Sequence, residues 1–209
     1  RSEDASNIAL KVNFFIIYLF YNNFAAGENT YSKVILPLVF TKIAGIVLSV
    51  LLILHEFEVH LSITDKLCHL NKATNCNTVL NDKASKVFGW FGWADVGFVY
   101  FTGIFLFLLQ SPEGEGLSLI AILAALSVPY PLFSIYYQGV VLKKWCPMCL
   151  GVQLILITEF VLLMPQFSQL SFSLDSVTRL VLSLLVISIV YTLFILFQRE
   201  QMSGELHYY

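Results

Sequence analysis

Charged residues are scarce in this sequence. Lysine, arginine, aspartate and glutamate make up only 12% of its 209 residues, against roughly a quarter in a typical soluble domain. Hydrophobic residues account for 57% of the chain and the mean hydropathy is +0.76, and a soluble fold of this length could not bury so much apolar surface. The net charge of −2 lacks the basic excess of nucleic-acid-binding proteins. We therefore expect membrane lipid, and no nucleic acid, as a partner.

The chain also lacks low-complexity tracts and internal repeats, and has instead a series of long apolar runs. About 20 apolar residues cross a bilayer as an α-helix, and five runs meet this requirement. They are residues 34–54, 93–109, 117–141, 146–164 and 180–197. The third run should be kinked by Pro129 and Pro131. The pattern predicts an all-α fold, a membrane helical bundle.

The N-terminal segment gives a weaker signal. Residues 8–24 are apolar and aromatic but contain Lys11 and three asparagines, so they could form a sixth span, an interfacial helix or a signal-like segment. We favour the interfacial helix. The chain is therefore divided into an N-terminal apolar segment (1–33), a transmembrane domain (34–199) and a tail (200–209).

The four cysteines form two closely spaced pairs. Cys68 and Cys76 lie in the only long loop, residues 56–92, while Cys146 and Cys149 form the motif Cys-Pro-Met-Cys where the fourth span begins. Because two spans separate the loop from the motif, both pairs lie on the same side of the membrane. We expect the loop pair to be mobile enough to visit both the motif and an outside partner.

The position of Cys146 at a helix start favours thiol chemistry. The free backbone N–H groups and the dipole at a helix N-terminus stabilise a thiolate, which is the reactive form, and Pro147 suits the first turn. A disulfide that closes only two intervening residues is reactive, since a short loop gains little from closure. Two exchangeable pairs on one face predict an electron relay.

Two other uses of four cysteines stay open at this point. They could form structural disulfides in an oxidising compartment, which would make the chain a non-enzymatic subunit of a membrane complex. They could also bind zinc, but the spacing of Cys68 and Cys76 is longer than in the usual zinc knuckle. We expect redox exchange and no metal site.

Three sequence elements occur together in a fixed order. They are the C-x7-C pair within LCHLNKATNCNTVL, the motif VFGW (87–90) before the second span, and WCPMCLGVQ (145–153) at the fourth. With these elements, residues 35–197 resemble the vitamin K epoxide reductase (VKOR) family. In the other quinone-linked family, the DsbB type, the CxxC motif precedes the spaced pair, whereas here it follows. The five spans look most like the bacterial relatives.

The resemblance implies a role for each cysteine. Cys68 would exchange with a thioredoxin-like partner, and Cys76 would pass electrons to Cys146. Cys149 would meet a quinone, menaquinone or ubiquinone, inside a four-helix catalytic core to which a fifth transmembrane helix is added. The outcome would be disulfide formation in exported proteins. Only residues 198–209 follow the fifth span, so we expect the partner to be a separate protein or to lie outside this sequence.

The resemblance also suggests quinone contacts. They are Gln153, Trp93, Asp95 and Phe88. Gln153 stands where a family tyrosine bonds the quinone, and an interhelical hydrogen bond is an equal alternative for it. Trp93 stands where relatives often have asparagine, with Asp95 two residues on. Phe88 belongs to an aromatic group that anchors the interface and also caps the pocket.

Two acidic residues lie where a carboxylate is unexpected, one near a cysteine pair and one within a span. Asp82 stands where relatives often have serine or threonine, and a carboxylate beside a thiol slows its attack; Ser85 could supply the hydroxyl instead. Glu159 lies about 15 Å into the fourth span, where an ionisable group is a functional hypothesis by default. It could relay a proton or bond to another helix, and we favour the structural role.

The charge distribution conflicts with the chemistry over orientation. Six lysines lie on the cysteine side, and counting them favours a cytoplasmic cysteine face. They are Lys66, Lys72, Lys83, Lys86, Lys143 and Lys144. Thiol oxidation and the family resemblance both need an oxidising face. We therefore expect a multi-pass protein of the bacterial inner membrane with its cysteines facing the periplasm.

Overall fold

A computed structural model of the chain describes residues 30–57, 68, 74–88, 91–110, 116–169 and 173–205. The segment 8–24 lies outside these ranges, so its assignment as an interfacial helix stays a prediction.

Five helical segments in the described ranges are long and apolar enough to cross a membrane. They are α2 (Thr30–Glu56), α5 (Trp93–Gln110), α6 (Leu117–Ser127) continued by α7 (Pro129–Tyr136), α8 (Pro147–Leu163) and α9 (Leu174–Glu205). All five predicted spans are confirmed. The protein is an all-α membrane helical bundle.

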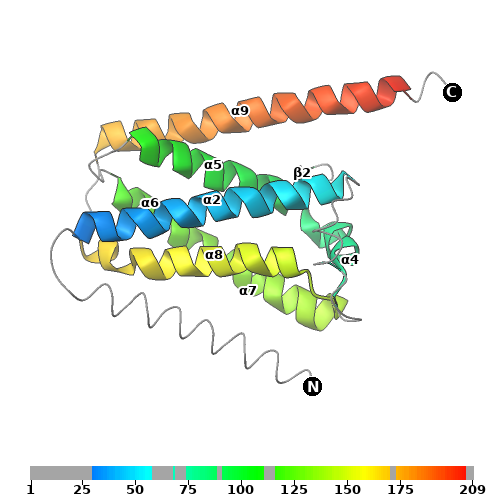
Figure 1. The fold of residues 1–209 in the computed structure, drawn as a ribbon, viewed down its shortest axis with the longest axis horizontal. Helices are drawn as coiled ribbons and strands as arrows, with labels where there is room; N and C mark the ends of the chain where they lie inside the picture. The colour runs from blue at the N-terminus through cyan, green and yellow to red at the C-terminus, as the bar shows by residue number, and fades with distance from the viewer. Residues whose placement is uncertain are drawn as a thin grey trace.

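Helix α2 packs against both α5 and α8 and lies between them in the view of Figure 1. Helix α6 packs on α8, and α9 runs along the outer side of α5 (Figure 1). The result is a core of four spans with a fifth added at one side, as the sequence predicts.

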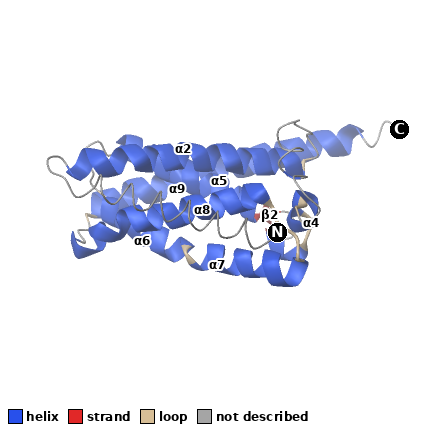
Figure 2. Ribbon diagram, turned by 60° about the horizontal axis from the view of Figure 1, so that its bottom comes forward, coloured by secondary structure: helices blue, strands red, loops and turns tan. Residues whose placement is uncertain are grey.

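The third span bends where its prolines enter. Val128 donates its backbone N–H to the carbonyl of Ala125 at 3.2 Å, which is a tighter turn than that of an α-helix. Pro129 has no N–H to continue the helix, so α7 begins there as a separate helix (Figure 2). Helix α7 then passes into a π-helical turn, η2 (Tyr137–Leu142), which ends just before the Cys-Pro-Met-Cys motif.

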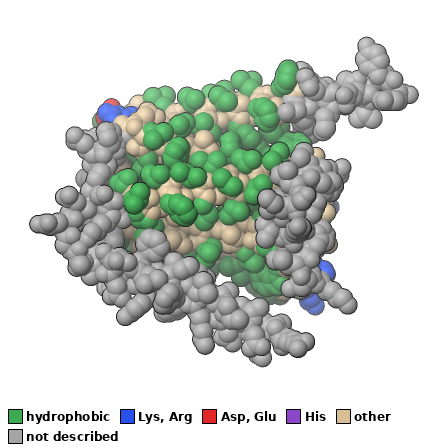
Figure 3. Space-filling view, viewed as in Figure 1, with side chains coloured by type: hydrophobic (Ala, Val, Ile, Leu, Met, Phe, Trp, Pro, Cys, Tyr) green, Lys and Arg blue, Asp and Glu red, His purple; other side chains and the backbone are tan. Residues whose placement is uncertain are grey.

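The outer surface of the bundle is apolar. Large side chains of α9 such as Leu185, Ile189 and Leu193 are exposed, as are Leu36 and Phe40 of α2. Hydrophobic side chains cover the described middle of the molecule, and charged ones show only at its ends (Figure 3). A continuous apolar surface of this extent is the surface expected to face lipid.

The long connection between α2 and α5 is more structured than the sequence predicts. It contains α4 (Cys76–Leu80), the 3-10 turn η1 (Lys83–Ser85), and a two-stranded hairpin of β1 (Lys86–Phe88) and β2 (Phe91–Gly92). We call residues 74–88 the cap. The expectation of a mobile loop is wrong for this part of it, because short elements packed on the bundle replace free chain.

Three contacts fix the cap to the bundle. The backbone N–H of Asn75 donates to the carbonyl of Trp145 at 3.0 Å, directly before the Cys-Pro-Met-Cys motif. The indole of Trp93 donates to the carbonyl of Ala84 at 3.1 Å. Lys86 forms an ion pair with Glu56 at the end of α2. These contacts join the cap to α2, to α5 and to the connection that precedes α8.

The fifth helix begins earlier than predicted. Helix α9 starts at Leu174 instead of residue 180, because the hydroxyl of Ser173 accepts the backbone N–H of Ser176 at 3.1 Å and so caps an additional turn. A 3-10 segment, η3 (Met164–Gln169), follows α8.

Candidate active site

The four cysteines meet in one buried cluster at the α4 end of the bundle. Cys68 is bonded to Cys76, and Cys146 to Cys149, with Cα atoms 5.2 Å apart in each pair. Leu52 of α2 and other apolar side chains of α5 and α8 pack around them. Cys68 and Cys146, which are 78 residues apart in the sequence, are thus brought to one place.

The loop pair is less accessible than the sequence suggests. Cys68 and Cys76 are both 0% exposed. The expectation that Cys68 is open to an outside partner is therefore not met in this state.

The Cys-Pro-Met-Cys motif is held as a helix N-terminus. Cys146 is the N-cap of α8, and its sulfur accepts the backbone N–H of Cys149 at 3.2 Å. Pro147 occupies the first helical turn, where its missing N–H leaves no hydrogen bond unmade. The local geometry is the one predicted from the spacing, and it leaves backbone donors around the sulfur of Cys146.

Two glutamine side chains and a serine hydroxyl form a hydrogen-bond network that supports the motif. Gln138 of η2 accepts the backbone N–H of Cys146 at 2.9 Å and donates to the hydroxyl of Ser134 at 3.1 Å. Gln153 donates to the same hydroxyl at 2.5 Å. The sequence analysis missed Gln138 and Ser134. Their spacing of four residues, which places them on one face of a helix, was the available signal.

Cys149 lines one of two neighbouring cavities. A small cavity of about 60 Å³ is lined by Cys149, Ser134 and Trp93. A larger one of about 530 Å³ shares Trp93, Tyr130 and Val152 with it and is mostly apolar. Its lining includes Leu126, whose side chain is 70% exposed on the lipid-facing surface. The larger cavity, on the lipid side, thus has walls in common with the cavity that Cys149 lines.

A comparison with protein-family models identifies residues 36–164 as a match to the vitamin K epoxide reductase family. The chain belongs to the VKOR family. No curated protein and no solved structure matches it. The protein is therefore a membrane oxidoreductase, and its two cysteine pairs at disulfide distance fit thiol–disulfide exchange.

Of the quinone contacts expected for a VKOR protein, Trp93 lines the cavities, whereas Gln153 lines neither and is bonded to Ser134, which lines the small one. Trp93 lines both cavities, with its ring centroid 4.9 Å from that of Tyr130. Gln153 is 1% exposed and makes the interhelical hydrogen bond to Ser134, while its carbonyl oxygen Oε1 has no hydrogen-bond partner. The interhelical alternative is thus realised, and an unused acceptor remains beside it.

The other two expected contacts are placed differently. Asp95 accepts the backbone N–H of Gly92 at 2.6 Å and the hydroxyl of Tyr191, and it lines neither cavity. This position ties α5 to β2 and α9, and it argues against Asp95 as a quinone contact. Phe88 contributes its backbone to β1, and its side chain lies outside the described part of the chain.

Asp82 is engaged in the cap. Its carboxylate accepts the backbone N–H of Ala84 at 2.9 Å and the hydroxyl of Tyr137 at 2.8 Å, so it links the cap to the end of α7. The hydroxyl of Ser85 donates to the carbonyl of Asp82 at 2.7 Å, and Ser85 lines the small cavity with Cys149. Ser85 and Cys149 therefore lie at the same cavity.

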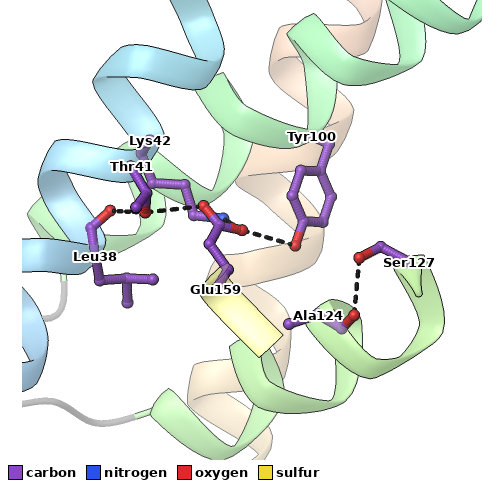
Figure 4. Close-up of polar contacts among 7 residues, drawn as sticks. All are labelled: Leu38, Thr41, Lys42, Tyr100, Ala124, Ser127 and Glu159. Atoms are coloured by element: carbon purple, nitrogen blue, oxygen red, sulfur yellow. Dashed lines mark hydrogen bonds and ion pairs between the residues drawn. The ribbon is translucent and has the colours of Figure 1, made fainter. Parts of the chain in front are cut away.

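A buried charge cluster lies one turn beyond the larger cavity. Glu159, which is 0% exposed, forms an ion pair with Lys42 at 2.7 Å and accepts the hydroxyl of Thr41 at 3.0 Å. The hydroxyl of Tyr100 lies 3.3 Å from the same carboxylate (Figure 4). The predicted bond from Glu159 to another helix is confirmed. Its cationic partner was not foreseen, because Lys42 is 117 residues away in the sequence.

Proposed function

We propose that this protein passes electrons from a thioredoxin-like protein to a membrane quinone and so supports disulfide formation in exported proteins. The observation that carries the proposal is the arrangement of the cysteines. Both pairs share one buried cluster, and Cys149 alone of the four lines the small cavity, which shares Trp93, Tyr130 and Val152 with the larger cavity on the lipid side. A structural staple has no need of cavities beside one of its sulfurs.

The proposed relay has four exchanges. A partner thiolate attacks Cys68 once the cap has moved, and the bond to Cys76 breaks. The freed thiolate of Cys76 then attacks Cys146, and Cys149 leaves as a thiolate beside the small cavity. The second thiolate of the partner attacks the bond to Cys68, which completes the partner disulfide, and Cys68 then attacks Cys76 and releases Cys146. Each exchange breaks one disulfide and forms another, so the motif gains the two electrons that the partner loses.

The larger cavity fits a quinone ring. It is mostly apolar, has aromatic walls at Trp93 and Tyr130, and opens past exposed Leu126 and Phe133, which suits the isoprenoid tail of menaquinone or ubiquinone. A quinone supplies a two-electron acceptor that takes up two protons. Gln153 supports this site indirectly, because its amide donates to Ser134, which lines the small cavity with Cys149.

The proposal can be tested with purified protein in lipid nanodiscs, reduced thioredoxin as the thiol probe and a short-chain ubiquinone as the acceptor. We expect one thioredoxin disulfide to form for each quinol. If thioredoxin stays reduced and both internal disulfides resist mild reductant, the protein is instead a membrane subunit with structural disulfides.

The proposed location is the bacterial inner membrane with the cysteines facing the periplasm, against the lysine count. Alkaline phosphatase fused after Gly92 should be active, because the enzyme matures only outside the cytoplasm. A matched fusion after Gln110, at the other end of α5, should be inactive. The reverse pattern would place the cysteines in the cytoplasm.

A further inference from the structure

The buried charge cluster has a loosely held member. The carboxylate of Glu159 is fixed from α2 by Lys42 at 2.7 Å and Thr41 at 3.0 Å. The hydroxyl of Tyr100 lies 3.3 Å from it, which is longer than the usual 2.5–3.0 Å of an O–H···O bond. The proton of Thr41 is shared between Glu159 and the carbonyl of Leu38, so Lys42 is the main partner of the carboxylate. Tyr100 makes the longest of the three contacts with Glu159, and its proton is the one most easily passed to another acceptor.

Tyr100 stands between the cluster and the larger cavity. It lines that cavity together with Val152 and Leu156, while its hydroxyl reaches Glu159 (Figure 4). On α8, Cys149, Val152, Leu156 and Glu159 follow one another at spacings of three or four residues and so share a face. Leu156 lies about 10 Å along the helix from Cys149. Tyr100 is thus at the end of the cavity away from the reactive sulfur.

The composition of the cluster is unexpected for a purely structural contact. Lys42 and Glu159 are each 0% exposed within a membrane-spanning segment, where charges are costly and usually functional. Apolar side chains of similar volume would hold the same helices together at least as well as a buried ion pair. Lys42 also lies 4.4 Å from the centre of the Tyr100 ring, so the charge is directed at this tyrosine.

We propose that Tyr100 is the proton donor to the quinone oxygen that lies farther from Cys149, and that Lys42 restores its proton through Glu159. The inference rests on the proposed quinone reduction. The thiols of Cys146 and Cys149 lose two electrons and two protons, and the quinone gains two electrons and two protons to become a quinol. One thiol proton goes to the nearer quinone oxygen, and Tyr100 gives its hydroxyl proton to the farther one and receives a proton from the Lys42 ammonium by way of the Glu159 carboxylate. The other thiol proton is released to water, and one proton taken up from water restores Lys42.

The direct test is Tyr100→Phe, which removes the hydroxyl and keeps the ring. We expect the rate of short-chain ubiquinone reduction to fall by about 10²-fold, the usual contribution of a positioned acid. Quinone affinity, measured by quenching of tryptophan fluorescence, should weaken by less than about tenfold. Reduction of the Cys68–Cys76 disulfide by dithiothreitol without quinone should keep its normal rate. The control Tyr136→Phe changes an exposed tyrosine and should leave all three values unchanged.

A second variant removes the proton source and keeps Tyr100. The charge-neutral Lys42→Met/Glu159→Leu protein should fold, bind quinone and react with dithiothreitol normally, and should reduce quinone at least tenfold more slowly. Unchanged quinone reduction in Tyr100→Phe would overturn the inference and leave the proposed function intact. Equal losses in quinone reduction and in the dithiothreitol reaction would also overturn it, because they indicate a structural role. A wild-type protein that reduces no quinone would remove both proposals.

Discussion

Cys149→Ala should abolish quinone reduction and trap a disulfide between Cys76 and Cys146. The variant keeps the thiol of Cys146 but removes its normal partner, so this thiol attacks the neighbouring loop pair at Cys76 and frees Cys68. Loss of a residue that carries the covalent chemistry reduces turnover by about 10³-fold or more. The cysteines already share one buried cluster, so the trapped bond needs only a local shift of the cap. Peptide mass spectrometry without reductant identifies the bond.

The matched control is Cys146→Ala. It leaves Cys149 bordering the small cavity but removes the thiol that exchanges with the loop, so no disulfide to Cys76 should form. Both variants keep one cysteine of the motif, and the relay predicts opposite outcomes for them. The assigned order of electron transfer would be wrong if Cys149→Ala retained turnover. It would also be wrong if Cys146→Ala formed a Cys76–Cys149 bond as readily as Cys149→Ala forms the Cys76–Cys146 bond.

The spans and the motif could be predicted because their signals are local. Five apolar runs are long enough for a bilayer whatever surrounds them, and all five form helices. Cys146 and Pro147 begin α8 as their spacing requires, since the N-cap and the first turn depend on neighbouring residues alone. The kink at Pro129 has the same origin.

The cap and the supporting network could not be predicted because their partners are distant in the sequence. The short helix α4 has five residues, too few to be stable alone, and it is held by contacts such as that of Asn75 with Trp145. Gln138 was not among the residues predicted from the sequence. Its role depends on the π-helical turn that directs it to Cys146, and no sequence pattern marked that turn.

Lys42→Met should destabilise the protein by about 3–5 kcal/mol, the cost of leaving one member of a buried ion pair without its partner. Glu159 would remain 0% exposed with only the hydroxyls of Thr41 and Tyr100 near its charge. The measurement is the free energy of unfolding in mixed micelles as the fraction of denaturing detergent rises. A loss below about 1 kcal/mol would mean that the pair contributes no more than a surface salt bridge.

The double variant Lys42→Met/Glu159→Leu should recover that loss, because replacing both charges by apolar side chains is often neutral or stabilising. Thr41 keeps a partner in this variant, since its hydroxyl also donates to the carbonyl of Leu38 at 2.8 Å. Tyr100 still faces the larger cavity. Stability and quinone reduction should therefore separate: the double variant is as stable as the wild type but slow. Recovery of both together would mean that the ion pair serves only to join α2 to α8.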